Sequence, residues 1–308
     1  MLENDELQQA TNILLRGDKK EAARQLWCLE PKISDKKMRI QLIDGLLSAS
    51  NPIDGGEKLL NLNQEGIKIA KEFNNKLIEA HFILRRCSLL MGKLIFPQHE
   101  QSNLKLSPDW LEFSTESDKL GHEELGKEIK KIEDEIENLF SQAVKIAKEE
   151  NNKQTLANVL LSRGNQTNIN LLRFKSECIR GKLGVKLWVK FDLLRRPLFD
   201  ILIVMNIKQW KKIRQMTKSF TQDIINAAEI FEDLGDVSAG YAYYTLANDL
   251  NTVYRFGAAS KYIIKAKSIA QKYKDALLLK QIEILQTVIK EKNRKIPNYI
   301  EGERREFN

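Results

Sequence analysis

The side chains of this chain that could perform catalysis occur singly rather than in clusters. The three histidines, His81, His99 and His122, are far apart, and no second histidine follows His122 at the spacing of a zinc-protease helix. The motifs GxGxxG, GxxxxGK[ST] and GxSxG are absent. Carboxylates alternate with lysines, an arrangement that suits solvation better than general acid catalysis. We therefore predict a binding protein with no catalytic residue and no cofactor, not an enzyme.

The cysteines predict neither a disulfide framework nor a metal site. Cys28, Cys87 and Cys178 are widely spaced, without a CxxC pair, which favours free thiols. The N-terminal sequence is acidic and does not resemble a signal peptide, so we expect a cytoplasmic protein. The longest apolar stretch, residues 198–207, is interrupted by Asp200 and Asn206 and is far shorter than the roughly 20 residues that span a bilayer. We expect no transmembrane segment.

Positive charge is concentrated in one segment. The chain has a formal net charge of +8, but residues 163–218 hold 14 Lys and Arg against three acidic residues, a local charge of +11. Such a segment could bind phosphates. The candidate basic patch contains Lys175, Arg180, Lys182, Lys186 and Lys190 on a helix predicted over 176–194, and Lys211, Lys212 and Arg214 beyond the following turn. A solvated face, an acidic protein, an anionic membrane surface and nucleic acid remain alternatives.

These residues must be positioned by helices, because one short helical block recurs along the chain. The blocks begin at Gly66, Ala143, Gly184, Ala227 and Ala266, so the steps between them are 77, 41, 43 and 39 residues. The first step is about two periods of 40 residues. A period in this range is typical of a solenoid, in which each unit buries its apolar face only by stacking on its neighbours.

Helix boundary signals and composition divide the chain into four segments. Helical repeats are expected in 1–96 and 118–292, a loop insertion in 97–117 and a flexible tail in 293–308. Ser219 with Gln222 has the spacing of a capping box and predicts a helix start. Gly235-Asp236 predicts a helix end followed at once by a new helix.

The last repeat resembles a tetratricopeptide repeat, of the subclass with lengthened, 40-residue units. Its large residues are Tyr243, Leu246, Leu250 and Ile263, and its small residues are Ala247, Ala259 and Ala266. Counting 20 or 21 residues on from the start of a repeated block places the small helix position of the earlier units at Cys87, Gly164 and Met205, with Ile83, Leu160 and Ile201 four positions earlier. The resemblance implies an all-α fold, a right-handed α-solenoid of antiparallel helix pairs in which small side chains allow helix axes to approach closely.

The resemblance also implies a peptide-binding groove. In that family the position after the small residue faces the concave side, and here it holds Ser88, Asn165, Asn206 and Asn248. A carboxamide offers a donor and an acceptor, which match the N–H and C=O groups of any peptide. We call Ser88 and the three asparagines the ladder. Around it we expect Arg163 to pair with an acidic group of the ligand, with further contacts from Asn168, Tyr241, Tyr244 and Asn251.

We therefore expect a non-catalytic scaffold or adaptor that binds a peptide or protein segment in its concave groove, as a subunit of a larger complex or as a peptide sensor. Binding of nucleic acid or another anionic partner through residues 163–218 is the alternative. The sequence leaves the identity of the partner and the oligomeric state open.

Overall fold

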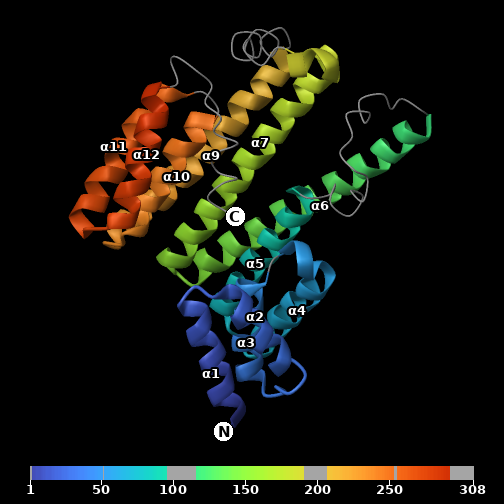
Figure 1. Ribbon diagram of the computed structural model, residues 1–308, viewed down its shortest axis with the longest axis vertical. Coiled ribbons are helices and arrows are strands. Elements are labelled where there is room, and N and C mark those ends of the chain that lie inside the picture. The colour runs from blue at the N-terminus through green and yellow to red at the C-terminus, as the bar shows by residue number, and fades with distance from the viewer. Residues whose placement is uncertain (1, 51, 96–115, 191–206, 253–254, 292–308) are drawn as a thin grey trace. The chain divides into compact units, whose positions relative to one another are not determined.

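The computed structural model describes residues 2–50, 52–95, 116–190, 207–252 and 255–291 (Figure 1). This described part consists of 11 helices and their connections and holds no strand. The predicted all-α class is therefore confirmed. Contacts between Cα atoms divide the chain into an N-terminal unit, Met1–Val159, and a C-terminal unit, Leu160–Asn308. The boundary falls inside the segment 118–292.

The N-terminal unit is built from helices that pack on their neighbours in chain order. They are α1 (Leu2–Leu15), α2 (Lys19–Leu29), α3 (Lys36–Ala49), α4 (Pro52–Glu72, with a kink at Gly56), α5 (Lys76–Ile95) and α6 (Glu116–Glu149). Side-chain caps fix two of the starts, because Asp18 accepts from the backbone N–H of Glu21 and Asp35 accepts from Met38. A continuous core of buried aliphatic and aromatic side chains, including Leu26 and Phe82, joins these helices.

The C-terminal unit contains α9 (Ile207–Asp233), α10 (Ser238–Thr252), α11 (Phe256–Tyr273), α12 (Ala276–Glu291) and most of α7 (Lys153–Lys190). The predicted break at Gly235 is confirmed: α9 ends two residues earlier, Gly235 has φ +68°, and Ser238 begins α10. Glycine adopts this left-handed conformation at little cost. The connection is short, and α10 packs against α9 and α11.

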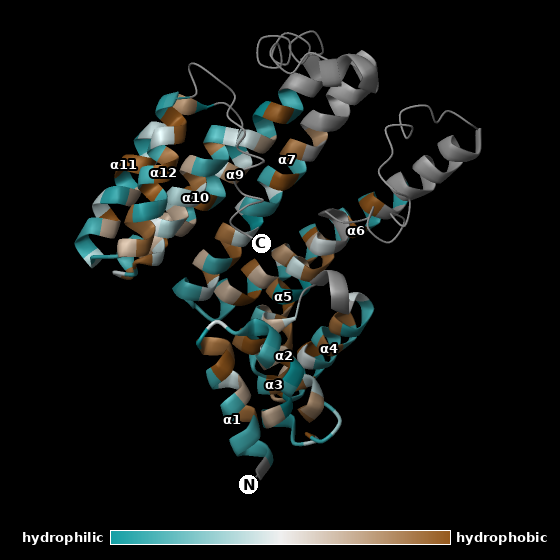
Figure 2. Cartoon of the chain, in the orientation of Figure 1, coloured by the Kyte–Doolittle hydropathy of each residue, from teal (hydrophilic) through white to brown (hydrophobic). Residues whose placement is uncertain are grey.

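The residues that match the tetratricopeptide pattern in α10 and α11 are all buried. They are Tyr243, Leu246, Ala247, Leu250, Ala259, Ile263 and Ala266, none more than 3% exposed. Hydrophobic residues recur along these helices and alternate with hydrophilic ones (Figure 2). Cys87 in α5 and Gly164 in α7, the predicted small positions of earlier repeats, are buried as well. Met205 and Ile201 lie outside the described residues.

Gly164 shows why a small residue is needed at such a position. A Cβ atom at Gly164 would lie 2.5 Å from Ile224 Cγ1 and 3.2 Å from the carbonyl oxygen of Phe220, both on α9. Two helices can approach this closely only where one of them carries no side chain.

The helix boundaries predicted near residues 175 and 219 are wrong. Residues 176–190 belong to the same helix as Gly164, because α7 continues without interruption to Lys190. Ser219 is not a cap, since it lies inside α9. The described part of the predicted 176–194 helix is helical, as expected, but it extends the preceding helix and does not form a separate one. The 40-residue period therefore does not mark helix ends in this region.

Two contacts show that α7 and α9 run antiparallel in constant register. Arg163 meets Asp223, and the Lys212 ammonium lies 4.2 Å from the ring centroid of Phe174. From Arg163 to Phe174, and from Asp223 back to Lys212, the chain covers 11 residues in each case. We call α7 from Phe174 onward and α9 up to Ser219 the hairpin arms.

Candidate functional site

The structure describes seven of the predicted ligand-binding residues in the C-terminal unit. Four of them lie on α10, and three lie on α7. Asn165 and Asn168 are one turn apart on α7, and Arg163 precedes them. Tyr241, Tyr244, Asn248 and Asn251 are on α10 and are partly buried. The structure brings the two helices together at Asn168, whose side chain lies close enough to the Asp249 carboxyl to oppose the rise in pKa that burial causes there. Asp249 follows Asn248 directly, so the amide residues of both helices border one buried polar contact.

Four buried side-chain oxygens on α7 and α10 accept no hydrogen bond from the described part of the chain. They are Asn165 Oδ1, Gln166 Oε1, Asn168 Oδ1 and Asp249 Oδ2. Gln166 and Asn168 are each 4% exposed, and Asp249 is 9% exposed. Such buried acceptors are uncommon, because each loses its hydrogen bonds to water on folding. The three amide oxygens are acceptors, whereas the Asp249 carboxyl accepts when it is ionised and donates when it is protonated. A partner that satisfies the amide oxygens must supply N–H or O–H donors. We call these four residues the acceptor cluster.

Burial changes the protonation of Asp249, the one titratable residue among these four. Removal of the Asp249 carboxyl from water raises its pKa to about 7, although the Asn168 side chain acts in the opposite direction. Near neutral pH this side chain is therefore present in both its protonated and its ionised form. Sequence reasoning missed Asp249, because an aspartate beside Asn248 on an otherwise amphipathic helix reads as a solvated residue.

Arg163 and the predicted tyrosine contacts have partners within the chain. Arg163 donates from Nε to Asp223 Oδ2 at 2.8 Å and from Nη2 to Asp223 Oδ1 at 2.6 Å. Tyr241 donates to Asp275 Oδ2 at 2.9 Å. Burial raises the pKa of Tyr241, and the Asp275 carboxylate adds to that effect. Tyr244 and Asn248 also interact within the chain. In this conformation Arg163 thus uses two of its five N–H donors to join α7 to α9.

The two remaining residues of the predicted ladder do not belong to the described part of the C-terminal unit. Ser88 is an exposed residue of α5 in the N-terminal unit and donates to the carbonyl oxygen of Leu84 in its own helix. Asn206 lies outside the described residues.

Only part of the predicted basic patch has described side chains. Lys211, Lys212 and Arg214 are exposed on α9. The backbone of α7 is helical at Lys175, Arg180, Lys182, Lys186 and Lys190, but their side chains lie outside the described residues.

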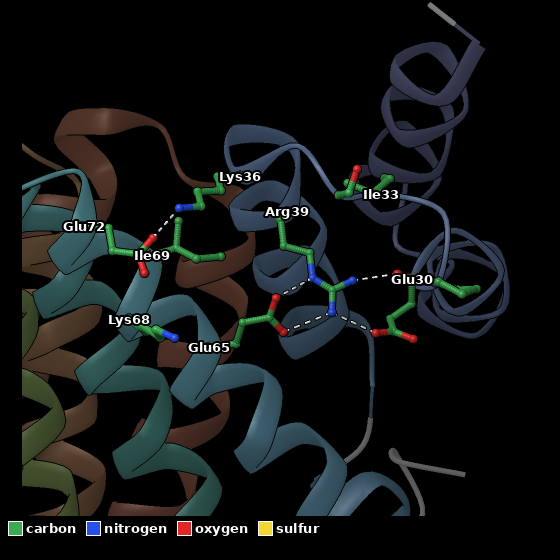
Figure 3. Close-up of a pocket in the computed structure, with 10 residues that line it drawn as sticks. Glu30, Ile33, Lys36, Arg39, Glu65, Lys68, Ile69 and Glu72 are labelled. Atoms are coloured by element: carbon green, nitrogen blue, oxygen red, sulfur yellow. Dashed lines mark hydrogen bonds and ion pairs between the residues drawn. The ribbon is translucent and has the colours of Figure 1, made fainter.

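A cavity of about 490 Å³ in the N-terminal unit has no counterpart in the sequence predictions (Figure 3). Arg39 on α3 is its central residue. Its Nε and Nη2 donate to the two carboxylate oxygens of Glu65 on α4, at 2.7 and 3.0 Å. Nη2 also donates to the Glu30 carboxylate at 2.8 Å, and Nη1 donates to the Glu30 carbonyl oxygen at 2.6 Å. The hydrogen bonds to Glu65 contribute most to raising the pKa of Arg39.

This cavity is best explained as a structural network. Lys36 is paired with Glu72 at 2.6 Å, and Lys68 completes three positive and three negative side chains around the space. The charges balance, and four donors of Arg39 are already engaged with the end of α2 and with α4 (Figure 3). The network therefore joins three helices and leaves little charge for a ligand.

The described residues contain no group of three or more His, Cys, Asp and Glu side chains that could hold a metal ion. None of the helices in those ranges has both the length and the apolar character needed to cross a bilayer.

The described chain is an all-helical protein in which consecutive helices pack on one another. Comparison with models of protein families and with curated proteins gives no match. The resemblance to tetratricopeptide repeats thus stands on the residue pattern alone.

Proposed function

We propose that the C-terminal unit binds an extended peptide or protein segment across α7 and α10, and that the protein is a non-catalytic scaffold or adaptor. Asn165 and Asn248 are the outer contacts, since both residues are only partly buried. The acceptor cluster beneath them receives N–H donors of the bound segment.

The observation that carries this proposal is the acceptor cluster itself. An unsatisfied buried acceptor costs about 1–3 kcal/mol, so the amide oxygens of Asn165, Gln166 and Asn168 favour a partner that supplies hydrogen-bond donors. A peptide presents a regular series of N–H donors regardless of its side chains. Rotation of the partly buried Asn165 amide about χ2 would bring its oxygen to the surface, where such a donor can reach it.

A tetratricopeptide-like, right-handed superhelix is the arrangement that we propose for these helices. The buried small residues at the predicted positions and the close approach at Gly164 support it. We place the protein in a reducing compartment, the cytoplasm, in keeping with the free thiols of Cys28 and Cys87.

The experiment is a selection of binding peptides followed by measurement of one of them. A displayed library of random linear peptides is enriched on the full chain, and a selected peptide is synthesised with a fluorophore. Fluorescence anisotropy then gives Kd for the wild type and for the double variant Asn165→Ala, Asn248→Ala. We expect the double variant to bind at least about tenfold more weakly, because two hydrogen-bonding amides are removed.

Gln271→Ala with Ser268→Ala, at exposed positions of α11, is the control and should bind like the wild type. Circular dichroism checks that every variant is folded. A ladder of neutral amides also predicts that Kd changes little between low and moderate salt. Normal binding by the Asn165, Asn248 double variant, or a library that yields no binder to the wild type, would contradict the proposal.

A further inference from the structure

The exposed side of α9 in the hairpin arms carries charge of one sign. Lys211, Arg214 and Lys218 are exposed, and they are separated by three and four residues, so they lie on one stripe of the helix. With a rise of 1.5 Å per residue, their Cα atoms are about 4.5 and 6 Å apart along the axis. α9 contains no acidic residue before Asp223. We call these three residues the cationic stripe.

An ordinary solvated helix face in the same chain looks different. On α6, exposed Lys127, Lys130 and Lys131 are followed by exposed Asp134 and Glu137, so both signs are interspersed. Like charges three and four residues apart destabilise a helix by about 0.2–0.5 kcal/mol per pair. The three cations of the stripe thus do not stabilise α9 through one another, and an anionic partner would offset their mutual repulsion.

Lys212 has a different environment and does not belong to the stripe. Its ammonium lies over the ring of Phe174, so it helps to hold the hairpin arms together. The facing arm of α7 adds positive charge of its own, since residues 175–190 contain Lys175, Arg180, Lys182, Lys186 and Lys190 against Glu177 alone. Both hairpin arms, on α7 and on α9, are thus rich in positively charged residues.

The neighbours of the stripe indicate which kind of anion it fits. The other exposed residues between Lys211 and Gln222 are Gln215, Ser219 and Gln222, besides Lys212, and none of the large exposed hydrophobic residues of the described chain lies on α9. A helix that binds membranes inserts apolar side chains beside its cations. Here the exposed residues described from Lys211 to Gln222 are all hydrophilic, and Gln and Ser side chains bond readily to phosphate and sugar oxygens.

From the cationic stripe, its hydrophilic neighbours and the like charge of the facing arm, we infer that the hairpin arms bind the phosphate backbone of a nucleic acid. The contact does not read sequence, because the described exposed side of α9 holds no aromatic side chain for base stacking and its cations are arranged for phosphates. This inference is independent of the peptide site on α7 and α10.

The experiment measures binding of the full chain to a short, fluorescently labelled, mixed-sequence duplex DNA by anisotropy, between about 50 and 200 mM salt. The triple variant Lys211→Gln, Arg214→Gln, Lys218→Gln is compared with a matched variant, Lys19→Gln, Lys20→Gln, Lys37→Gln, that loses the same charge at exposed positions of the N-terminal unit. We expect the triple variant to bind at least about tenfold more weakly. The slope of log Kd against log salt should fall by about 0.9 for each lost phosphate contact.

The matched variant should keep the wild-type slope, and Lys211→Arg with Lys218→Arg should retain affinity. Duplexes of different sequence should bind equally well. A parallel titration with vesicles of phosphatidylcholine and phosphatidylserine separates the membrane alternative. The inference is overturned if the wild type does not bind the duplex, if it binds only the anionic vesicles, or if the triple and the matched variants lose the same affinity.

Discussion

Arg163 on α7 and Asp223 on α9 form a two-point ion pair in which both carboxylate oxygens accept hydrogen bonds from one guanidinium. The Asp223 side chain is 10% exposed and that of Arg163 is 35% exposed, so the pair is largely shielded from water. Arg163 directly precedes Gly164, where a Cβ atom would overlap Ile224 of α9. The ion pair and the close packing thus define one junction between α7 and α9.

Loss of either partner should weaken this junction. We expect Arg163→Met or Asp223→Asn to lower the free energy of unfolding by about 1–3 kcal/mol, the range for hydrogen bonds to charged groups. Urea denaturation of the two single variants and the double variant measures the coupling between them. Strictly additive effects would show that the two side chains do not stabilise each other.

Gly164→Ala should destabilise the protein by about 1–3 kcal/mol, because the added methyl group would overlap Ile224 Cγ1 and press on the Phe220 carbonyl. Gly257→Ala on α11 is the matched control, since a Cβ atom there has no neighbour within 4 Å. Adding Ile224→Ala to Gly164→Ala should cost less than the sum of the two single changes. Thermal melts that rank both glycine variants equally would contradict this packing.

Asp249 predicts a dependence of stability on pH. Its pKa is raised from 3.8 to about 7 in the folded chain, so between these values the folded state holds a proton that the unfolded state releases. The stabilising contribution is complete below about pH 4 and is lost as the pH rises through about 7. Asp249→Asn should therefore be more stable than the wild type by about 1–3 kcal/mol at pH 8, with little difference at pH 4.

Urea titrations at several pH values check this expectation, with Asp233→Asn as an exposed control. An asparagine at 249 can both accept from and donate to Asn168, so it replaces the protonated carboxyl closely. Equal loss of stability at pH 4 and pH 8 would mean that Asp249 acts only through packing.

Arg39→Lys should lower the free energy of unfolding by about 1–3 kcal/mol although the charge is retained. A lysine cannot reproduce the fork that bonds Glu65 at two points and Glu30 at two more. Lys68→Gln, on the wall of the same cavity, is the control and should change stability by less than about 0.5 kcal/mol. Chemical denaturation compares the two, and equal effects would exclude a special role for the guanidinium.

Cys87 should be unreactive in the folded protein. Burial raises the pKa of its thiol to about 12, whereas Cys28 is exposed. In a Cys178→Ala background, a maleimide at neutral pH should label one thiol in buffer and two in denaturant, and mass spectrometry of peptides should place the first label on Cys28. Rapid labelling of Cys87 in buffer would show that α5 opens readily.

The sequence predicted local packing well and helix length poorly. Cys87, Gly164 and Ala247 were predicted as small packing residues from the period and the size pattern, and all three are buried. The helix start near residue 176 was predicted from that period, yet no proline occurs between Pro108 and Pro197, and glycines such as Gly181 cost a helix only about 1 kcal/mol each. The absence of a strong breaker was the signal for the longer helix.

The acceptor cluster and the Arg39 network could be predicted less well. Asn165 and Asn168 follow from the repeat pattern, but the burial of Asp249 arises only when α7 meets α10, an interaction between residues about 80 positions apart. Arg39 likewise joins residues on α2 and α4. Charged residues at such distances have no periodic signature.

Because α7 and α9 keep a constant register, the hairpin arms can differ in length without a change in the folded core. The last buried residue described on α7 is Leu171, and the first on α9 is Phe220, so the described side chains between them contribute nothing fully buried. Adding or removing the same number of turns from both arms would leave the Arg163–Asp223 junction in place. Related chains could therefore carry arms of different reach on an unchanged helical framework, and grafted arms could give this framework new partners.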